Sequence, residues 1–325
     1  MYNIQMKTLC FWSPVHIGDI YVSSFFINHI CSQNPDIEFL YYTINGDIFF
    51  TDIPNLKFIE TINDPNYVNR NYTSDFVNGS PPEMNCDSKW LNFLLQNIGD
   101  RNHIATMNIN NTEYLFFNTW GASMSYDDFN FESISNAWNK SFNLLNTEYG
   151  YSFKFNFHDI ASIINNNSIP KPPLRENIAD FFNSTKSEYK KTVFCYNYVP
   201  RSLPFNTEKL QSYLGFISSK NDTLLVLATH NDSLCSRKNV VSCDSTFHIE
   251  KQMSCENLLH TWNVASRCDE IFVLPTGSSW LFYHNISDLK NKKVYLFGNK
   301  DYIEKLNKNI EIVTRDTEIG KIKSI

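Results

Sequence analysis

An aspartate stands where the first apolar stretch of the chain gives way to a helical pattern. Residues 8–12 (TLCFW) form an apolar run that is short enough for a buried strand. In the stretch SPVHIGDIYVSSFF, residues 13–26, the apolar residues then take up the spacing of one helix face. Asp19 lies between the two. It would either cap the helix or present a carboxylate at the carboxyl edge of a sheet, where open α/β sheets bind ligands.

Two of the ten glycines occupy matching places in the two halves of the chain. Gly18 follows the first apolar run, and Gly277 follows the run EIFVLP. Each comes at the start of a predicted helix, where a glycine lets a ligand approach closely and the helix N-terminus attracts anions. A tight turn that needs a small residue would explain either glycine alone. The pair favours ligand binding at the strand ends of both halves.

Further polar residues follow predicted strands of the second half. Arg201 lies in NYVPRSLPF, and a guanidinium suits phosphate because its fork donates two hydrogen bonds at once. A solvated loop cation is the alternative. His230 follows TLLVLAT, and Asp244 and His248 follow NVVSC. These three residues would either frame a nucleobase or serve as caps and turns of their loops.

The elements that must position these residues alternate along the chain. Continuous apolar runs predict parallel strands covered on both faces, and their alternation with helices predicts an α/β fold of two Rossmann-like, doubly wound domains facing across a cleft. The linker is predicted within residues 164–176, INNNSIPKPPLRE, which gives domains 1–168 and 169–325. Strands are predicted at 8–12, 38–43, 57–60, 114–120, 192–196, 223–229, 240–243, 270–274, 293–297 and 310–313. Helices after the first are predicted at 89–97, 133–145, 174–182, 207–219, 256–267, 278–284 and 301–306.

Composition narrows the class of function. A net charge of −6 argues against a nucleic-acid binder. The eight cysteines include no CxxC pair, and no signal peptide or apolar run of membrane-spanning length is evident, so we expect free thiols in a cytoplasmic protein. The histidines show no HExxH pattern and no cluster has zinc-like spacing. We therefore expect neither a resident metal nor a cofactor.

Three segments resemble GT-B glycosyltransferases, in particular the ADP-heptose:lipopolysaccharide heptosyltransferase family. They are HIGDIYVSSFFINHI followed by NPDIEFLYY, the segment EYLFFNTWG, and CENLLHTWNVASRCDEIFVLPTGSSWLFYH. The segments occur in the order of the family and comprise 63 of the 325 residues. The resemblance implies a GT-B fold and an inverting, metal-independent transfer of a sugar from a nucleotide-sugar donor to a glycan or lipid-linked acceptor.

The resemblance also implies roles for single residues. Asp19 matches the catalytic base, which takes a proton from the acceptor hydroxyl. Thr276, Gly277 and Ser278 match the turn that binds the donor diphosphate, and Arg201 lies where the family often places a basic residue. The family commonly has an acid where this chain has Pro275, which bears on the donor sugar. Two residues fall near the predicted cleft on the acceptor side, although a lone residue of either type is more often packed: His16 and Trp120.

Two other functions fit the same architecture. A nucleotide-sugar 2-epimerase would need further acids and histidines in the cleft, which His248 and Glu250 could supply. A non-catalytic sugar-binding protein would have lost the base, and Asp19 argues against it. A dinucleotide oxidoreductase and a P-loop enzyme are disfavoured, since the chain has neither G-x-G-x-x-G nor G-x-x-x-x-G-K-[ST]. Peripheral contact with a membrane stays open.

Overall fold

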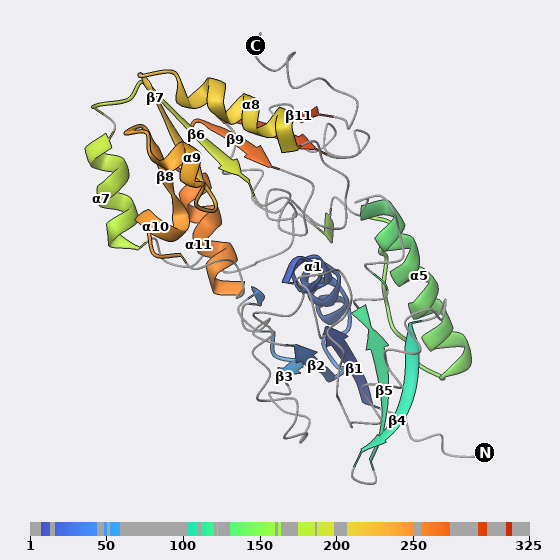
Figure 1. Ribbon diagram of the computed structural model, residues 1–325. Coiled ribbons are helices and arrows are strands. Elements are labelled where there is room, and N and C mark those ends of the chain that lie inside the picture. Colours follow the sequence, from blue (N-terminus) through green and yellow to red (C-terminus); the bar gives the residue numbers. More distant parts are fainter. Residues whose placement is uncertain are drawn as a thin grey trace, which may run out of the picture. The chain divides into compact units, whose positions relative to one another are not determined.

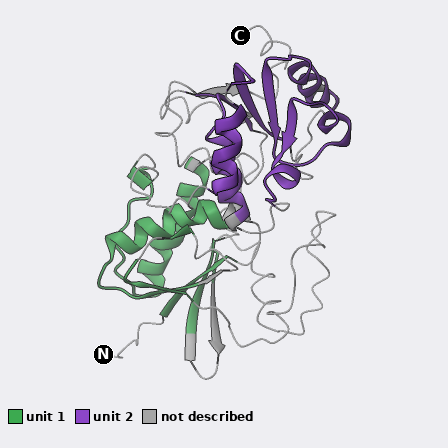
Figure 2. Ribbon diagram, turned by 90° about the vertical axis from the view of Figure 1, so that its left-hand side faces the viewer, with its two compact units in different colours: residues 1–170 green, residues 171–325 purple. Residues whose placement is uncertain are grey.

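The computed structural model divides the chain into two compact units, residues 1–170 and 171–325 (Figure 1; Figure 2). The predicted boundary, between residues 168 and 169, lies two residues ahead of this division. The structure describes residues 8–13, 17–43, 49–50, 53–58, 103–109, 112–119, 122, 131–159, 162–163, 175–185, 187–197, 207–249, 255–273, 292–297 and 310–313. Three predicted helices lie outside these residues: 89–97, 278–284 and 301–306.

Unit 1 is built on a five-stranded sheet with the order β3-β2-β1-β5-β4. The first four strands in this order are parallel, and β4 pairs antiparallel with β5 at the edge. The strand order reverses between β1 and β5, the point where such sheets bind ligands. The elements are β1 (Thr8–Ser13), α1 (Ile17–Gln33), β2 (Phe39–Thr43), β3 (Leu56–Phe58), β4 (Ile104–Ile109), β5 (Thr112–Asn118) and α5 (Phe131–Glu148).

Unit 2 contains a six-stranded, fully parallel sheet with the order β11-β10-β9-β6-β7-β8. Numbered within the unit, this is the order 3-2-1-4-5-6 of dinucleotide-binding domains. The strand order reverses between β6 and β9. The strands are β6 (Lys191–Tyr196), β7 (Thr223–Leu227), β8 (Val240–Ser242), β9 (Glu270–Val273), β10 (Lys293–Phe297) and β11 (Ile310–Val313). The helices are α7 (Glu176–Thr185), α8 (Thr207–Ser218), α9 (Asp232–Cys235), α10 (Cys243–Thr246) and α11 (Cys255–Ala265).

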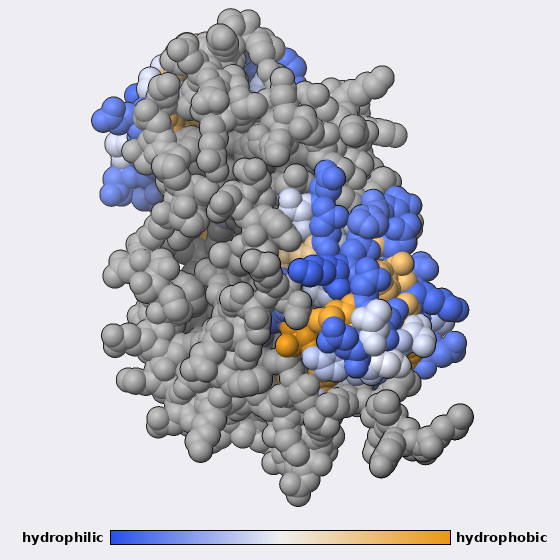
Figure 3. Space-filling view, turned by 90° about the vertical axis from the view of Figure 1, so that its right-hand side faces the viewer, coloured by the Kyte–Doolittle hydropathy of each residue, from blue (hydrophilic) through white to orange (hydrophobic). Residues whose placement is uncertain are grey.

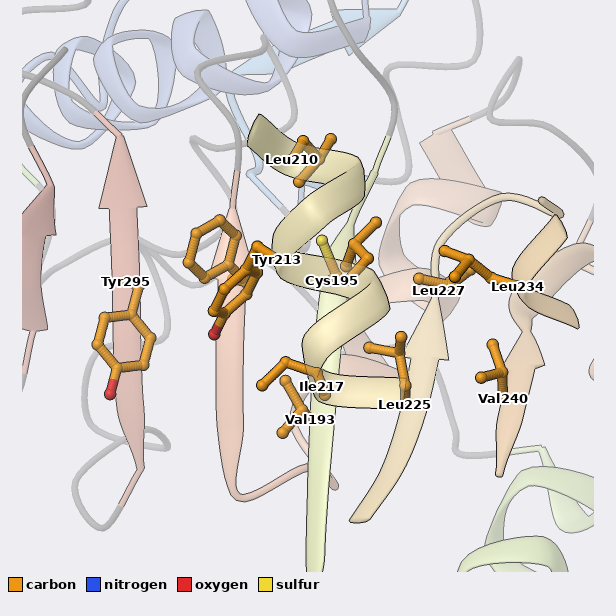
Figure 4. Close-up of a cluster of buried hydrophobic side chains, with 12 residues drawn as sticks. Val193, Cys195, Leu210, Tyr213, Ile217, Leu225, Leu227, Leu234, Val240 and Tyr295 are labelled. Carbon is orange, nitrogen blue, oxygen red and sulfur yellow. The ribbon is translucent and has the colours of Figure 1, made fainter. Parts of the chain in front are cut away.

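Helix α8 covers one face of the unit 2 sheet (Figure 4). Its Leu210, Tyr213 and Ile217 point toward side chains from β6, β7, β9 and β10 in one buried cluster. The alternate residues of the same strands, such as Phe194 and Val226, are also buried. Both faces of the sheet are therefore covered, which explains why its strands are continuous apolar runs.

Aromatic side chains dominate the core of unit 1. Phe11 of β1 lies within 6.1 Å of Trp138 and 6.4 Å of Phe142 of α5, measured between ring centroids. Phe26 of α1 stacks on Trp138 at 5.0 Å, so α1 and α5 meet over this part of the sheet. The described exposed residues of α5 recur at about helical spacing: Glu132, Asn136, Lys140, Asn143, Thr147 and Glu148. Figure 3 shows a face of the molecule on which hydrophilic and hydrophobic residues adjoin.

An extended segment after α5 completes this core. Gly150 turns the chain with φ +75°, a conformation that favours glycine. In residues 151–157 the odd-numbered aromatic side chains turn inward and the even-numbered residues are exposed. Two asparagines hold the segment by paired hydrogen bonds to its backbone: Asn34 to Lys154 and Asn146 to Phe153.

The α/β class, with parallel sheets flanked by helices, is thus confirmed. Strand β4 was not anticipated, and it makes unit 1 a mixed sheet rather than a purely parallel one. The last strand predicted in unit 1, at 114–120, ends at Asn118 as β5. The cysteines whose thiols the structure describes are all free: Cys10, Cys31, Cys195, Cys235, Cys243 and Cys268. The cleft between the units stays a prediction.

Candidate functional site

The carboxyl ends of β6 and β9 lie side by side at the switch point of unit 2. The two strands are parallel neighbours, and Tyr196 pairs with Val273 at their ends. Arg201 follows Tyr196 by five residues along the chain, and Thr276 follows Val273 by three. Arg201, Thr276, Gly277 and Ser278 themselves lie outside the described residues, so their part in a site stays a prediction.

Asn197 extends the sheet beyond the last residue of β6. Its Nδ2 donates to the carbonyl oxygen of Thr229 at 2.9 Å, and its Oδ1 accepts from the Thr229 N–H at 2.9 Å. The Thr229 hydroxyl also donates to Oδ1 at 3.2 Å. The side-chain amide thus takes the place of a peptide group in a ladder between the ends of β6 and β7. Sequence reasoning missed Asn197; its place directly after an apolar strand was the available signal.

Asp244 ties the ends of β7 and β8 together. Its Oδ2 accepts from the His230 N–H at 2.9 Å, and its Oδ1 accepts from the Ser242 hydroxyl at 2.6 Å and the Ser245 N–H at 2.8 Å. Partial burial alone would raise the pKa of Asp244, but these three hydrogen bonds stabilise the carboxylate and hold the pKa below its usual value. The structure therefore brings two of the predicted residues together, and the Asp244 carboxylate holds the backbone at His230.

The side chains of the two histidines predicted at this edge, His230 and His248, are exposed. The His230 ring places Nε2 3.0 Å from Oδ1 of Asp232, with both side chains open to solvent. Asn231 caps the short helix α9 by accepting from the Leu234 N–H. His248 has φ +54° in the turn after α10, and its side chain is exposed. Contact of His230, Asp244 or His248 with a nucleotide stays a prediction.

Hydroxyl groups gather at the switch point of unit 1. The hydroxyls of Ser13, at the end of β1, and Thr119, just after β5, are hydrogen-bonded to each other. Tyr41 of β2 donates its phenol to Ser13 Oγ at 2.9 Å, and Thr119 also donates to the Trp12 carbonyl at 3.0 Å. All three hydroxyl-bearing residues are buried. Their hydrogen bonds tie the carboxyl ends of β1 and β5 together, and the sequence alone did not reveal them.

Asp19 and Gly18 lie in the first turn of α1, which begins at Ile17. The helix therefore starts close behind the carboxyl end of β1, as the sequence predicts. Of Asp19 the structure describes the backbone only. His16 and Trp120 lie outside the described residues. The catalytic role of Asp19 and the contacts of the other three residues stay predictions.

Neither a metal-binding cluster nor a membrane-spanning helix occurs among the residues that the structure describes. Among those residues, no group of three or more histidines, cysteines or acids could hold a metal ion. No helix among them is long and apolar enough to cross a membrane. What the described residues define is an α/β protein of two sheets, each with hydrogen-bonded polar groups at its carboxyl edge.

The chain is similar to solved glycosyltransferase structures. A glycosyl transferase of family 9 from Veillonella parvula has 10% sequence identity and a TM-score of 0.43, covering 99% of this chain and 90% of its own. The Escherichia coli heptosyltransferase WaaC with ADP has 10% identity and a TM-score of 0.42, and the match covers 98% of this chain and 96% of that enzyme's chain. The same enzyme with ADP-2-deoxy-2-fluoro heptose has 12% identity and a TM-score of 0.40, and the match covers 98% of this chain and 99% of that enzyme's chain.

These structures are of the kind that the sequence resembles, but such low similarity defines no substrate, donor or mechanism for this chain. No family model matches the chain, and no curated protein matches it in sequence.

Proposed function

We propose that this protein is an inverting glycosyltransferase. It would move a sugar from a nucleotide-sugar donor to a hydroxyl of a glycan or lipid-linked acceptor. The observation that carries the proposal is the topology of unit 2, whose strand order is that of dinucleotide-binding domains and whose β6 and β9 end side by side. Arg201 and the Thr276–Ser278 turn of the sequence resemblance follow those two strand ends in the chain.

The proposed reaction assigns one role to each unit. Asp19 takes the proton of the acceptor hydroxyl while that oxygen attacks the anomeric carbon. The bond between the anomeric carbon and the diphosphate oxygen breaks, and the nucleoside diphosphate leaves with the bonding electrons. Attack from the face opposite the leaving group inverts the anomeric configuration.

The leaving diphosphate needs compensation for its negative charge. Backbone N–H groups and hydroxyls of Thr276, Gly277 and Ser278 would supply it, with Arg201 as a cation that donates two hydrogen bonds. The proposal involves no resident metal and keeps the cytoplasmic location that the sequence predicts. Pro275, where the family commonly has an acid, leaves the donor sugar to be identified.

Two linked measurements test the proposal. The first is a thermal-shift screen with ADP, GDP, UDP, CDP and their common sugar conjugates. The nucleotides of one base should raise the melting midpoint of the protein, because a ligand that binds only the folded state stabilises it. The conjugate that binds should then release its nucleoside diphosphate faster when an acceptor glycan is added. Release without transfer to any acceptor, together with isomerisation of the sugar, would favour the epimerase instead.

A glycine pair provides the matched control for the donor site. Gly277→Val should abolish the midpoint shift, since a side chain there would block the close approach of the diphosphate. Gly215→Val should leave the shift unchanged, because a Cβ at Gly215 of α8 meets nothing within 4 Å. Equal nucleotide binding by the wild-type protein and Gly277→Val would move the donor site elsewhere.

A further inference from the structure

Three strand ends of unit 2 form one hydrogen-bonded chain of polar groups. Asn197 at the end of β6 binds the backbone of Thr229, and the next residue, His230, donates its N–H to Asp244. Asp244 in turn accepts from the hydroxyl of Ser242, the last residue of β8. We call these five residues the carboxyl-edge network. It begins at β6, one of the two strands between which the strand order reverses.

Asn197 is the residue that connects β6 to the rest of the carboxyl-edge network. Thr229 is 7% exposed, so its N–H and carbonyl cannot rely on water. Asn197 satisfies both of these groups with one planar amide, at 2.9 Å each. Without this amide, two backbone groups of a buried residue would lose their partners, and the backbone bond from the Ala228 N–H to the Cys195 carbonyl would be the last tie between the ends of β6 and β7.

We propose that Asn197 is a positioning residue for the nucleotide, an inference that rests on the proposed function. Ligands of open α/β sheets lie outside the carboxyl ends of the strands at the switch point. Asn197 is the residue at which the chain leaves β6 at that point. By locking this exit to β7, and through Asp244 to β8, the amide keeps the carboxyl edge in one arrangement before the nucleotide arrives, which lowers the ordering cost of binding.

A second asparagine of the same unit provides the matched control. Asn239 donates through Nδ2 to the carbonyls of Ser218, Lys220 and Thr223 at 3.1, 3.0 and 2.9 Å. It precedes β8 and therefore lies at the amino edge of the parallel sheet, at the opposite strand ends from Asn197. Both asparagines bind backbone groups through their side-chain amides. They differ in which edge of the sheet they hold.

The experiment measures nucleotide affinity and stability in the full-length chain. The probe is the nucleoside diphosphate among ADP, GDP, UDP and CDP that the wild-type protein binds most tightly. Isothermal titration well below the melting midpoints compares the wild type with Asn197→Ala and Asn239→Ala. We expect both substitutions to lower the midpoint, whereas only Asn197→Ala weakens nucleotide binding, by about tenfold, as the loss of hydrogen bonds that order the site would. Asn239→Ala should stay within about twofold of the wild type.

The outcomes separate the inference from the proposed function. If the wild-type protein binds none of the four nucleotides, the proposed function fails and the inference fails with it. If it binds one of them and Asn197→Ala binds as tightly, or both variants lose affinity equally, only the inference is overturned. Should Asn197→Ala not fold, Asn197→Asp takes its place, because Asp keeps the acceptor for the Thr229 N–H and loses the donor to its carbonyl.

Discussion

Asn55 and Asn239 occupy the same place in the two units. Asn55 Nδ2 donates to the carbonyls of Cys31, Asn34 and Ile37 at 3.1, 2.8 and 3.0 Å, at the end of α1 and just beyond it. Asn239 Nδ2 likewise donates to three carbonyls, those of Ser218 at the end of α8, Lys220 beyond it and Thr223 at the start of β7. Each asparagine directly precedes the third strand of its unit. Its backbone carbonyl accepts a hydrogen bond, at 2.8 Å, from an N–H of the second strand, that of Phe39 or Leu225.

The first prediction concerns these two residues. Asn55→Ala and Asn239→Ala should each lower the free energy of unfolding by about 1–3 kcal/mol, because each leaves carbonyls at a helix end without a donor. Urea titrations followed by circular dichroism would measure the loss. Ser32→Ala, which removes only an exposed hydroxyl that donates to the His29 carbonyl, serves as the control and should change little. Wild-type stability in either asparagine variant would mean that water replaces the amide.

Asp19→Asn should separate chemistry from binding. The amide keeps the shape and the capping ability of the side chain but cannot take a proton. We expect the rate of sugar transfer to fall by roughly a hundredfold or more. The nucleotide affinity and the melting midpoint should stay close to those of the wild type. A variant that transfers sugar at the normal rate would reduce Asp19 to a helix cap.

His103 should make the stability of the protein depend on pH. Burial, and secondarily the charge of Lys140, lower the pKa of His103 to about 4 in the folded protein, against about 6.5 when unfolded. Between these values the unfolded chain binds the proton more readily. The stabilising contribution is therefore complete above pH 6.5 and is lost as the pH falls toward 4, on the order of 3 kcal/mol in total.

Urea titrations of His103→Asn across this pH range would isolate the effect. Asparagine tolerates the φ of +54° at this position and does not titrate, so the variant's stability should vary less with pH than that of the wild type. His248→Asn makes the same substitution at a position with the same φ but an exposed side chain, and serves as the matched control. Parallel profiles for His103→Asn and the wild type would contradict the assignment.

Sugar transfer should need no divalent metal. Metal-dependent transfer commonly relies on an Asp-x-Asp motif, and the chain contains none; its adjacent pair Asp127-Asp128 has a different spacing. Initial rates with excess EDTA should therefore equal those without it, once a donor has been found. A rate that collapses with the chelator and returns with magnesium would require carboxylate ligands that remain to be located.

The sequence predicted those parts of the fold that local pattern determines. Continuous apolar runs such as residues 223–227 mark buried parallel strands directly, and the helix of residues 131–148 shows its period clearly. Strand β4 was missed because IATMNI, residues 104–109, mixes polar and apolar residues and pairs, among the described strands, with β5 alone. Its strand conformation depends on that pairing more than on its own composition.

The contacts at the carboxyl edges could not be predicted in the same way. Ser13 and Thr119 are 106 residues apart, and Asn197 and Thr229 are 32 apart. Their proximity follows from the order and register of the strands, which no local pattern contains. By contrast, the sequence alone placed both His230 and Asp244 directly after predicted strands. Only the structure shows that the backbone of one binds the carboxylate of the other.

The closure of each sheet within its own unit bears on how the chain could evolve. Every strand pairing among the described residues joins strands on the same side of residue 170. A genetic crossover at this position would therefore replace one whole sheet without dividing a described hydrogen-bonded ladder. If the two units bind acceptor and donor separately, recombination between related genes could combine a new acceptor preference with an old donor preference in one step. Natural chimaeras would then have their junctions close to this residue.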